Sequence, residues 1–223
     1  MKLAKVFKEN KQFTLFSILA LVVVGVAVFA PQIAPYDPLD AVMLESLQAP
    51  SSAHPFGTDK LGRDLLSRVI FGTRTSLIMT LCLVAVIFVI GTFLGVIAGF
   101  FGGIVDGVIM RIADMMISFP GLVLAAVSWT KYARLARSMV LRVKKNLYIE
   151  AAVVNGTRTW KILLVHVLPN MVTQMVVTAA ADIGTMMLEL ASLSFLGFGA
   201  TAPTPEWGLM LNEGRTYMAK APW

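Results

Sequence analysis

Residues 76–101 form an unbroken apolar stretch of twenty-six residues without a single charged side chain. A helix needs only ~20 such residues to cross the ~30 Å hydrocarbon core of a bilayer, so this stretch is long enough even when tilted. Two further stretches, Phe13–Ala30 and about Asn170–Leu196, are similarly long and mostly apolar. The sequence therefore predicts an all-α, polytopic membrane protein.

The overall composition agrees with a protein that has lipid as its solvent. The chain is 57% hydrophobic and 14% charged, whereas an ordinary soluble domain carries about 25% charged residues. The net charge of +6 could indicate nucleic-acid binding, but the basic residues fall in blocks beside apolar stretches, which is typical of topology signals. Cys82 is the only cysteine, so an intramolecular disulfide is excluded.

The two basic blocks predict which segments face the cytoplasm. The first twelve residues carry four lysines, and residues 131–161 carry eight basic residues against one acid, Glu150. Residues 35–75 instead carry five acids and four bases, a near balance that suits the outer side of the membrane. Because cytoplasmic loops are enriched in Lys and Arg, we expect a cytoplasmic N-terminus and a cytoplasmic 131–161 block.

The segment from Val108 to Trp129 does not fit this topology as a simple span. One crossing would leave the basic block outside, whereas two crossings need ~40 residues and the segment has twenty-two. Either the segment is re-entrant, or residues present in a longer protein are absent near Leu122–Val127. We favour absence, because a re-entrant backbone must be shielded by protein or line a cavity.

A short motif follows the basic block. Residues 150–156 read Glu-Ala-Ala-Val-Val-Asn-Gly, and Leu-Pro-Asn follows at 168–170. The small side chains of Ala151 and Ala152 after the carboxylate of Glu150 suit a short helix that docks in a groove of a partner. Gly156 can adopt the positive φ that reverses the chain after such a helix. An ordinary interfacial helix end explains these residues equally well.

This motif resembles the signature cytoplasmic loop of permease subunits of ATP-binding-cassette (ABC) importers, in which the loop forms a coupling helix on the ATPase subunit. Two further stretches resemble the dipeptide, oligopeptide and nickel branch of that family, and specifically its second, C-type permease. One is His54-Pro-Phe-Gly-Thr-Asp-Lys-Leu-Gly-Arg-Asp-Leu-Leu-Ser-Arg68. The other is Ala191-Ser-Leu-Ser-Phe-Leu-Gly-Phe-Gly199 together with Pro203-Thr-Pro-Glu-Trp-Gly208.

The resemblance implies a type I importer permease with six spans, of which about four to five are represented here. With the charge pattern, it divides the chain into a cytoplasmic interfacial segment (1–12), a first span (13–34), an external segment (35–75) and a permease core (76–223). The core would contain a cytoplasmic coupling loop at about 146–168. Family members carry about twenty more residues before Trp129 and add a sixth span at the C-terminal end.

The resemblance also implies partners and a location. A second homologous permease would complete the pore in the inner membrane of a bacterium, two ATPase subunits would bind ATP and Mg, and an extracytoplasmic solute-binding protein would deliver cargo. The chain has no Gly-x4-Gly-Lys phosphate loop, so we expect a transport subunit that is not itself an enzyme. The cargo, small peptides or nickel as an ion or chelate, stays open.

Gly91, Gly95 and Gly99 repeat every fourth residue within the 76–101 stretch. Small residues at this spacing form a flat stripe that lets another helix approach closely in lipid. We expect helix packing here, and a pore-lining backbone face is the alternative.

The last apolar stretch contains two carboxylates, Asp182 and Glu189, seven residues apart and thus on nearly one helical face. With Met186 and Met187 they could form a cation route, since carboxylates and thioethers both bind metals, and this favours nickel slightly. The alternative is a helix–helix contact with methionine as filler. No firm metal site is predicted. A cation- or proton-coupled secondary transporter and a membrane scaffold are the competing function classes.

Overall fold

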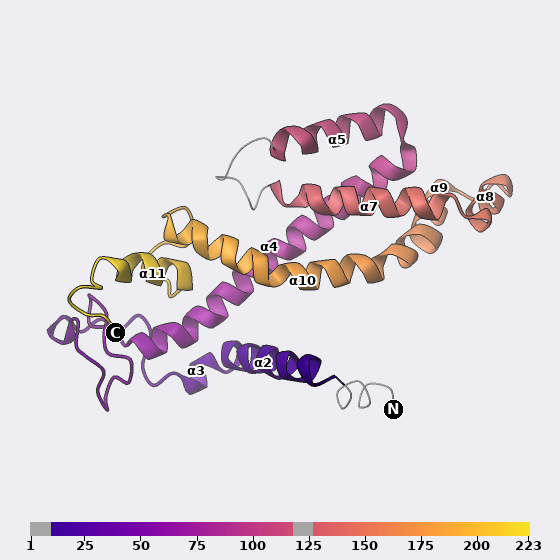
Figure 1. Ribbon diagram of the computed structural model, residues 1–223. Helices are drawn as coiled ribbons and strands as arrows, with labels where there is room; N and C mark the ends of the chain where they lie inside the picture. Colours follow the sequence, from indigo (N-terminus) through magenta and orange to yellow (C-terminus); the bar gives the residue numbers. More distant parts are fainter. Residues whose placement is uncertain (1–9, 118–126) are drawn as a thin grey trace. The chain divides into compact units, whose positions relative to one another are not determined.

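The computed structural model describes residues 10–117 and 127–223, and over these residues it is helical without a β-strand (Figure 1). The prediction of an all-α fold is confirmed. The elements are α2 (Lys11–Val28), α3 (Ala30–Ile33), the short 3-10 helix η1 (Met43–Glu45), α4 (Leu65–Phe101), α5 (Gly103–Ile117), α7 (Trp129–Lys144), α8 (Leu147–Val154), α9 (Thr159–Lys161), the π-helical turn η2 (Ile162–Val167), α10 (Leu168–Phe195) and α11 (Trp207–Arg215).

Three helical segments of the described chain are long and apolar enough to cross a membrane: Lys11–Val28, Leu65–Phe101 and Thr159–Phe195. They coincide with the three predicted apolar stretches, but each begins earlier than hydropathy indicated, the last two by about eleven residues. The last one is helical from Thr159, ten positions before Pro169, and its η2 turn ends two residues before that proline. A proline ring crowds the carbonyl four residues earlier in a regular α-helix, and a wider π-turn at this place relieves the conflict.

The chain forms two compact units. The terminal unit comprises residues 1–79 and 190–223, and the central unit comprises residues 80–189. Helices α4 and α10 contribute residues to both units.

Within the central unit, α5 and α7 form an antiparallel hairpin (Figure 1). Arg137 pairs with Asp106, and Arg134 pairs with Asp114, so the two helices run in opposite directions. The helices have 15 and 16 residues. At 1.5 Å per residue, each is about 23 Å long, which is shorter than the ~30 Å hydrocarbon core.

The hairpin brings the end of α7 back to the end of α4. The ammonium of Lys144, at the end of α7, donates to the carbonyl of Phe100 at the end of α4 over 2.7 Å. The basic block that starts within α7 thus continues from a point beside the end of α4. The absence that we favoured near residues 122–127 lies almost wholly outside the described residues.

The core of the central unit is built from three long helices. Most of its buried side chains come from α4, α7 and α10, and others come from α8 and η2. The methionines of α10 are packed among aliphatic and aromatic neighbours: Val84, Ile87, Val96, Tyr132, Ala136, Val140, Met171, Met175 and Met186. Methionine fills irregular gaps between helices well because it is unbranched and flexible.

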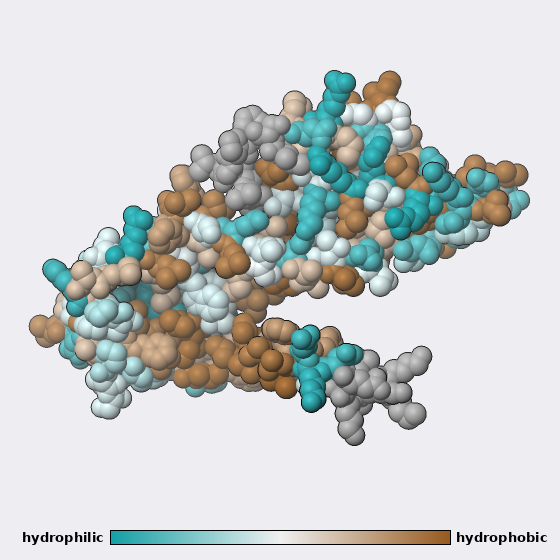
Figure 2. Space-filling model, viewed as in Figure 1, coloured by the Kyte–Doolittle hydropathy of each residue, from teal (hydrophilic) through white to brown (hydrophobic). Residues whose placement is uncertain are grey.

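In the terminal unit, α2 is apolar on every side. Its side chains are largely exposed, and Ala27 is the buried residue within it. Figure 2 shows the corresponding hydrophobic surface along α2. A helix that is hydrophobic all round is normally covered by lipid or by protein.

Candidate functional site

Helix α8 carries the predicted coupling motif. It ends at Val154, and Gly156 has φ +69°, the left-handed conformation predicted for it. The amide of Gly156 donates to the carbonyl of Val153 over 2.9 Å, and the amide of Thr157 donates to that of Ala152 over 3.0 Å. This pair of bonds is the Schellman arrangement, which ends a helix sharply at a glycine.

One side chain anchors α8, and most of its other side chains are exposed. Ile149 is buried in the core of the central unit. Glu150 and Ala151 are exposed, and Val154 is 86% exposed. An eight-residue helix with one anchoring residue leaves an apolar face available to another protein.

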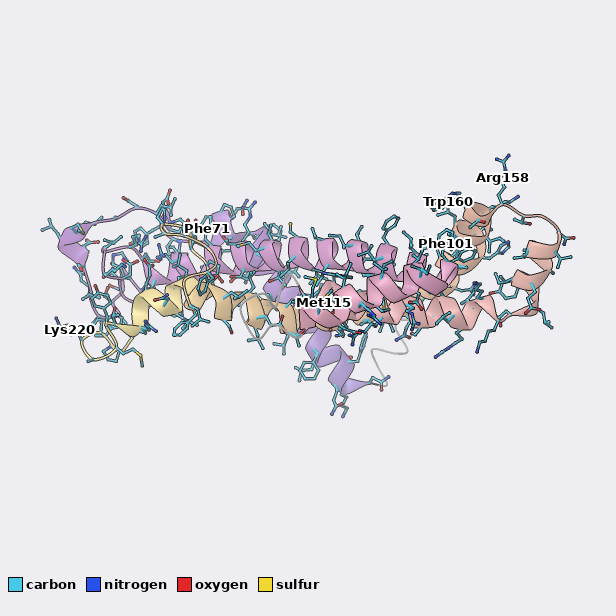
Figure 3. The ribbon with its side chains drawn as sticks, turned by 90° about the horizontal axis from the view of Figure 1, so that it is seen from above. Phe71, Phe101, Met115, Arg158, Trp160 and Lys220 are labelled. Atoms are coloured by element: carbon cyan, nitrogen blue, oxygen red, sulfur yellow. The ribbon has the colours of Figure 1, made fainter. Side chains whose placement is uncertain are left out.

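The residues that follow α8 extend this surface. Arg158 and Trp160 project away from the ribbon (Figure 3), and the large indole of Trp160 is mostly exposed. His166, which has no metal-ligand spacing in the sequence, lies with its ring against that of Tyr148, 6.2 Å between centroids. Arginine and tryptophan are enriched at the energetically important centres of protein interfaces.

The glycine stripe of α4 faces the backbone of α7. A Cβ added to Gly95 would lie 2.2 Å from the carbonyl oxygen of Ala133, and one added to Gly91 would lie 2.4 Å from that of Trp129. At Gly99 the corresponding distance, to the carbonyl of Arg137, is 2.9 Å. These distances favour close helix approach over a pore-lining role.

Asp182 on α10 is paired within the central unit. The ammonium of Lys131 lies 2.6 and 2.8 Å from its two carboxylate oxygens, and the hydroxyl of Tyr132 donates to it over 2.9 Å. The neighbouring Met186 is buried in the core. A carboxylate neutralised in this way suits a contact between α7 and α10, and it is already engaged by two donors.

Glu189, the second carboxylate of α10, differs from Asp182. One of its carboxylate oxygens is buried without a hydrogen-bond partner among the residues that the structure describes. The same part of the chain contains no group of three or more His, Cys, Asp or Glu side chains that could hold a metal ion. The residues of the expected translocation path, Asp182, Met186 and Glu189, all belong to α10.

The His54–Arg68 motif forms a network of hydrogen bonds and ion pairs at the start of α4. Asp64 accepts from both the amide and the hydroxyl of Ser67, each over 2.7 Å, and its other oxygen lies 2.9 Å from Nδ1 of His54. The second ring nitrogen of His54 lies 3.3 Å from the carboxylate of Glu45. An aspartate that accepts from the amide three residues ahead is a helix cap, which explains why α4 begins eleven residues before the apolar stretch.

Two arginines of the same motif bind Glu213 from the C-terminal part of the chain. Arg63 donates to Asp59 over 2.7 Å and reaches Glu213 of α11 at 3.4 Å, while Arg68 reaches the same carboxylate at 3.3 Å. Both arginine side chains are buried. Sequence reasoning recognised this motif only as a family resemblance and missed its ionic partners.

The Pro203–Gly208 stretch also has a structural role. Glu206 caps α11 by accepting from the amides of Gly208 and Leu209 over 2.9 and 2.8 Å. The indole of Trp207 donates to the carbonyl of Val69 on α4 over 3.2 Å. A Cβ on Gly208 would lie 2.1 Å from the carbonyl oxygen of Ala191, so the glycine is where α11 meets α10.

Comparisons with known proteins match two family models. Residues 118–221 match the inner membrane component of binding-protein-dependent transport systems, and residues 2–50 match the N-terminal transmembrane domain of oligopeptide transport permease C.

Several curated relatives match almost the whole chain. A protein named glutathione transport system permease protein GsiD, from Pectobacterium atrosepticum, is 41% identical over 222 residues, 91% of this chain and 74% of its own. A dipeptide transport system permease protein DppC from Alkalihalophilus pseudofirmus is 36% identical over 98% of this chain and 78% of its own. The probable D,D-dipeptide transport system permease protein DdpC of Escherichia coli K12 is 36% identical over 100% of this chain and 81% of its own.

The alignment with the Escherichia coli relative extends over 241 residues, although this chain has 223. The relative therefore contains residues without a counterpart in this chain. Given the two matching family models, the extent of these alignments and the all-helical architecture, the chain belongs to the peptide branch of the ABC importer permeases, the multi-pass inner-membrane subunits of these systems.

Proposed function

We propose that this chain transmits ATP-driven closure of two ATPase subunits to a membrane pore through which small peptides enter the cytoplasm. The observation that supports this most is α8: an exposed helix, anchored by Ile149, in the loop that carries the Glu150–Gly156 motif. On this proposal, Glu150, Ala151, Ala152 and Gly156 form or shape the surface that contacts the ATPase.

The contacts of α8 suggest how a movement would be transmitted. Its neighbours in the fold are α7 and η2, and η2 leads directly into α10. The bond from Lys144 to Phe100 fastens the end of α7 to the end of α4. A displacement of α8 would therefore act on α7 and α10 together, as expected for rigid-body alternating access.

The proposed orientation places α8 and the 1–12 segment in the cytoplasm and residues 35–75 outside. A second, homologous permease subunit would complete the pore and cover apolar surface such as that of α2. ATP and Mg would be bound by the two ATPase subunits, and an extracytoplasmic solute-binding protein would deliver the cargo.

The cargo that we propose is a small peptide. The relatives described above are named for dipeptide, D,D-dipeptide and glutathione transport. A nickel route along Asp182, Met186 and Glu189 has less support, because Lys131 and Tyr132 already engage Asp182. The same pairing weakens a secondary transporter that would use Asp182 as its proton or cation site.

Uptake by the reconstituted complex tests this function. Proteoliposomes would contain both permeases and both ATPases, with ATP enclosed, the binding protein and a radiolabelled dipeptide outside, and no ion gradient. We expect accumulation of the dipeptide that is at least tenfold greater with ATP than with a non-hydrolysable analogue. Uptake that does not depend on ATP but follows an imposed proton gradient would contradict the proposal and favour secondary transport.

A further inference from the structure

His54 is buried in the terminal unit with a carboxylate at each of its two ring nitrogens. Nδ1 lies 2.9 Å from an oxygen of Asp64, and Nε2 lies 3.3 Å from an oxygen of Glu45. The side chain of Asp64 is 1% exposed, whereas that of Glu45 is 41% exposed. Because Glu45 is the last residue of η1 and Asp64 caps α4, the imidazole connects these two elements.

Uncharged contacts hold the imidazole in this position. The amide of His54 donates to the hydroxyl of Ser51 over 3.1 Å. The carbonyl of His54 accepts from the amides of Ser51 and Gly57, each over 2.9 Å. The ring of Tyr36 lies against the imidazole, 5.0 Å between centroids. The ring therefore faces both carboxylates whatever its own charge.

The two carboxylates together require a proton on each ring nitrogen. An ionised carboxylate only accepts hydrogen bonds, so the contact with Asp64 places a proton on Nδ1. A neutral imidazole has one N–H, and its Nε2 would then turn a lone pair toward the carboxylate of Glu45. An imidazolium donates from both nitrogens. The observed geometry is thus that of the charged ring.

Other charged groups near this site have their own partners. Asp37, next to Tyr36, is exposed and accepts from the amide of Leu39 over 2.8 Å. Further pairs join the acids Asp59 and Glu213 to the bases Lys60, Arg63 and Arg68. Within the part of the chain that the structure describes, the titratable groups in contact with the imidazole are Glu45, Asp64 and Tyr36.

The backbone that follows η1 is strained. Leu47 has φ +54°, a conformation that is rare for a bulky side chain and persists only where surrounding contacts impose it. The amide of Leu47 donates to the carbonyl of Asp59 over 3.0 Å, and within η1 the amide of Glu45 donates to the carbonyl of Val42 over 2.8 Å. A short, strained segment with few bonds of its own opens locally when a further contact is lost.

We propose that His54 is a pH-sensitive switch that fastens η1 to the start of α4. The imidazolium holds Glu45 and Asp64 together. When the pH rises and Nε2 loses its proton to water, Nδ1 keeps its bond to Asp64, but Nε2 and Glu45 repel each other and η1 loosens. The switch therefore stabilises η1 at low pH, and this contribution is lost as the pH rises through the range of about 5 to 8 in which imidazole titrates.

The segment that the switch controls is apolar and accessible. Met43 and Leu44 of η1 are 69% and 95% exposed. The switch would set how firmly these two side chains are presented to their surroundings. Its response to acidity outside the cell rests on the proposed orientation of the chain, whereas the switch itself rests on the contacts of His54.

Hydrogen exchange of the assembled complex, followed by mass spectrometry, tests the switch without ATP and without peptide. Exchange is compared at pH 5.5 and 7.5 after correction for the intrinsic rate at each pH. We expect the amides of residues 43–48 to be protected at least about threefold more at pH 5.5. The amides of residues 65–68 should be equally protected at both pH values, because their cap at Asp64 does not need the second ring proton.

Two variants assign the effect to the ring. In Glu45→Gln the new amide group can donate to a neutral Nε2 or accept from a charged one, so the pH difference at residues 43–48 should disappear. The exposure of Glu45 makes this variant compatible with folding. His166→Gln is the matched control, because it removes the other of the two histidines, which lies in the central unit against Tyr148. It should retain the full difference.

Three results would overturn the switch. They are equal or greater protection of residues 43–48 at pH 7.5, a pH difference that survives in Glu45→Gln, and a parallel change at residues 65–68, which would indicate a loss of stability in the whole unit. None of these results bears on ATP-driven uptake, so the importer function would stand without the switch. Conversely, uptake that does not depend on ATP would contradict the importer function and leave the exchange result intact.

Discussion

Substituting Ala151 by Arg is expected to lower ATP-driven dipeptide uptake by at least tenfold while the permease still reaches the membrane. Ala151 is exposed on α8 and lies in the middle of the surface that we assign to the ATPase. A long cation there obstructs close packing, and substitutions at the centre of an interface commonly cost 2 kcal/mol or more, which is about thirtyfold in affinity. Uptake and co-purification of the ATPase subunits measure the effect.

The matched control for this prediction is Ala219→Arg. Ala219 is also exposed, but it belongs to the terminal unit and is not part of α8. We expect this variant to retain its ATPase subunits and its uptake. An Ala151→Arg complex that keeps both would remove α8 from the docking surface.

A leucine at Gly95 is expected to destabilise the permease by about 3 kcal/mol, since overpacking of a tight contact typically costs 1–3 kcal/mol. The first atom of the new side chain would lie 2.2 Å from the carbonyl oxygen of Ala133. Because that oxygen belongs to the backbone of α7, it cannot rotate away as a side chain could. For a chain of this size the change corresponds to a Tm lowered by about 10 °C.

Gly184→Leu is the control for Gly95→Leu. Gly184 is a helical glycine of α10, and a Cβ there meets nothing within 4 Å. Thermal unfolding of the detergent-solubilised complexes, followed by size-exclusion chromatography, compares the two variants. Equal transition temperatures would show that the glycine stripe does not hold α4 against α7.

The positions of the membrane-crossing segments could be predicted because hydropathy is a property of each segment alone. The start of α4 could not, because residues 65–75 are mixed in polarity and their helix depends on the cap at Asp64 and on the contact between Val69 and Trp207. These two contacts differ in their separation along the sequence. The cap joins residues three positions apart, whereas the contact between Val69 and Trp207 joins residues 138 positions apart.

The charge pattern revealed a conflict in the 108–129 segment but did not decide how it is resolved. The structure shows short antiparallel helices held by the pairs Asp106–Arg137 and Asp114–Arg134. Such pairs join residues 20 and 31 positions apart, so residue spacing on a single helix could not identify them. These two pairs can be identified only when the antiparallel arrangement of α5 and α7 is known.

For the candidate site, the Glu150–Gly156 motif predicted the short helix and its glycine turn. The partners of Asp182 were beyond sequence reasoning, because Lys131 and Tyr132 lie about fifty positions away on another helix. The ion pair between Arg68 and Glu213 was equally hidden, because the two residues lie 145 positions apart.

Site-specific photo-cross-linking in intact cells tests the docking of α8 most directly. A photoreactive amino acid would replace Val154, which is 86% exposed on α8, or Leu44, which is 95% exposed in the terminal unit. The account predicts a cross-link from position 154 to an ATPase subunit and none to that subunit from position 44. An ATPase adduct from position 44, with none from position 154, would contradict both the docking surface and the proposed orientation of the chain.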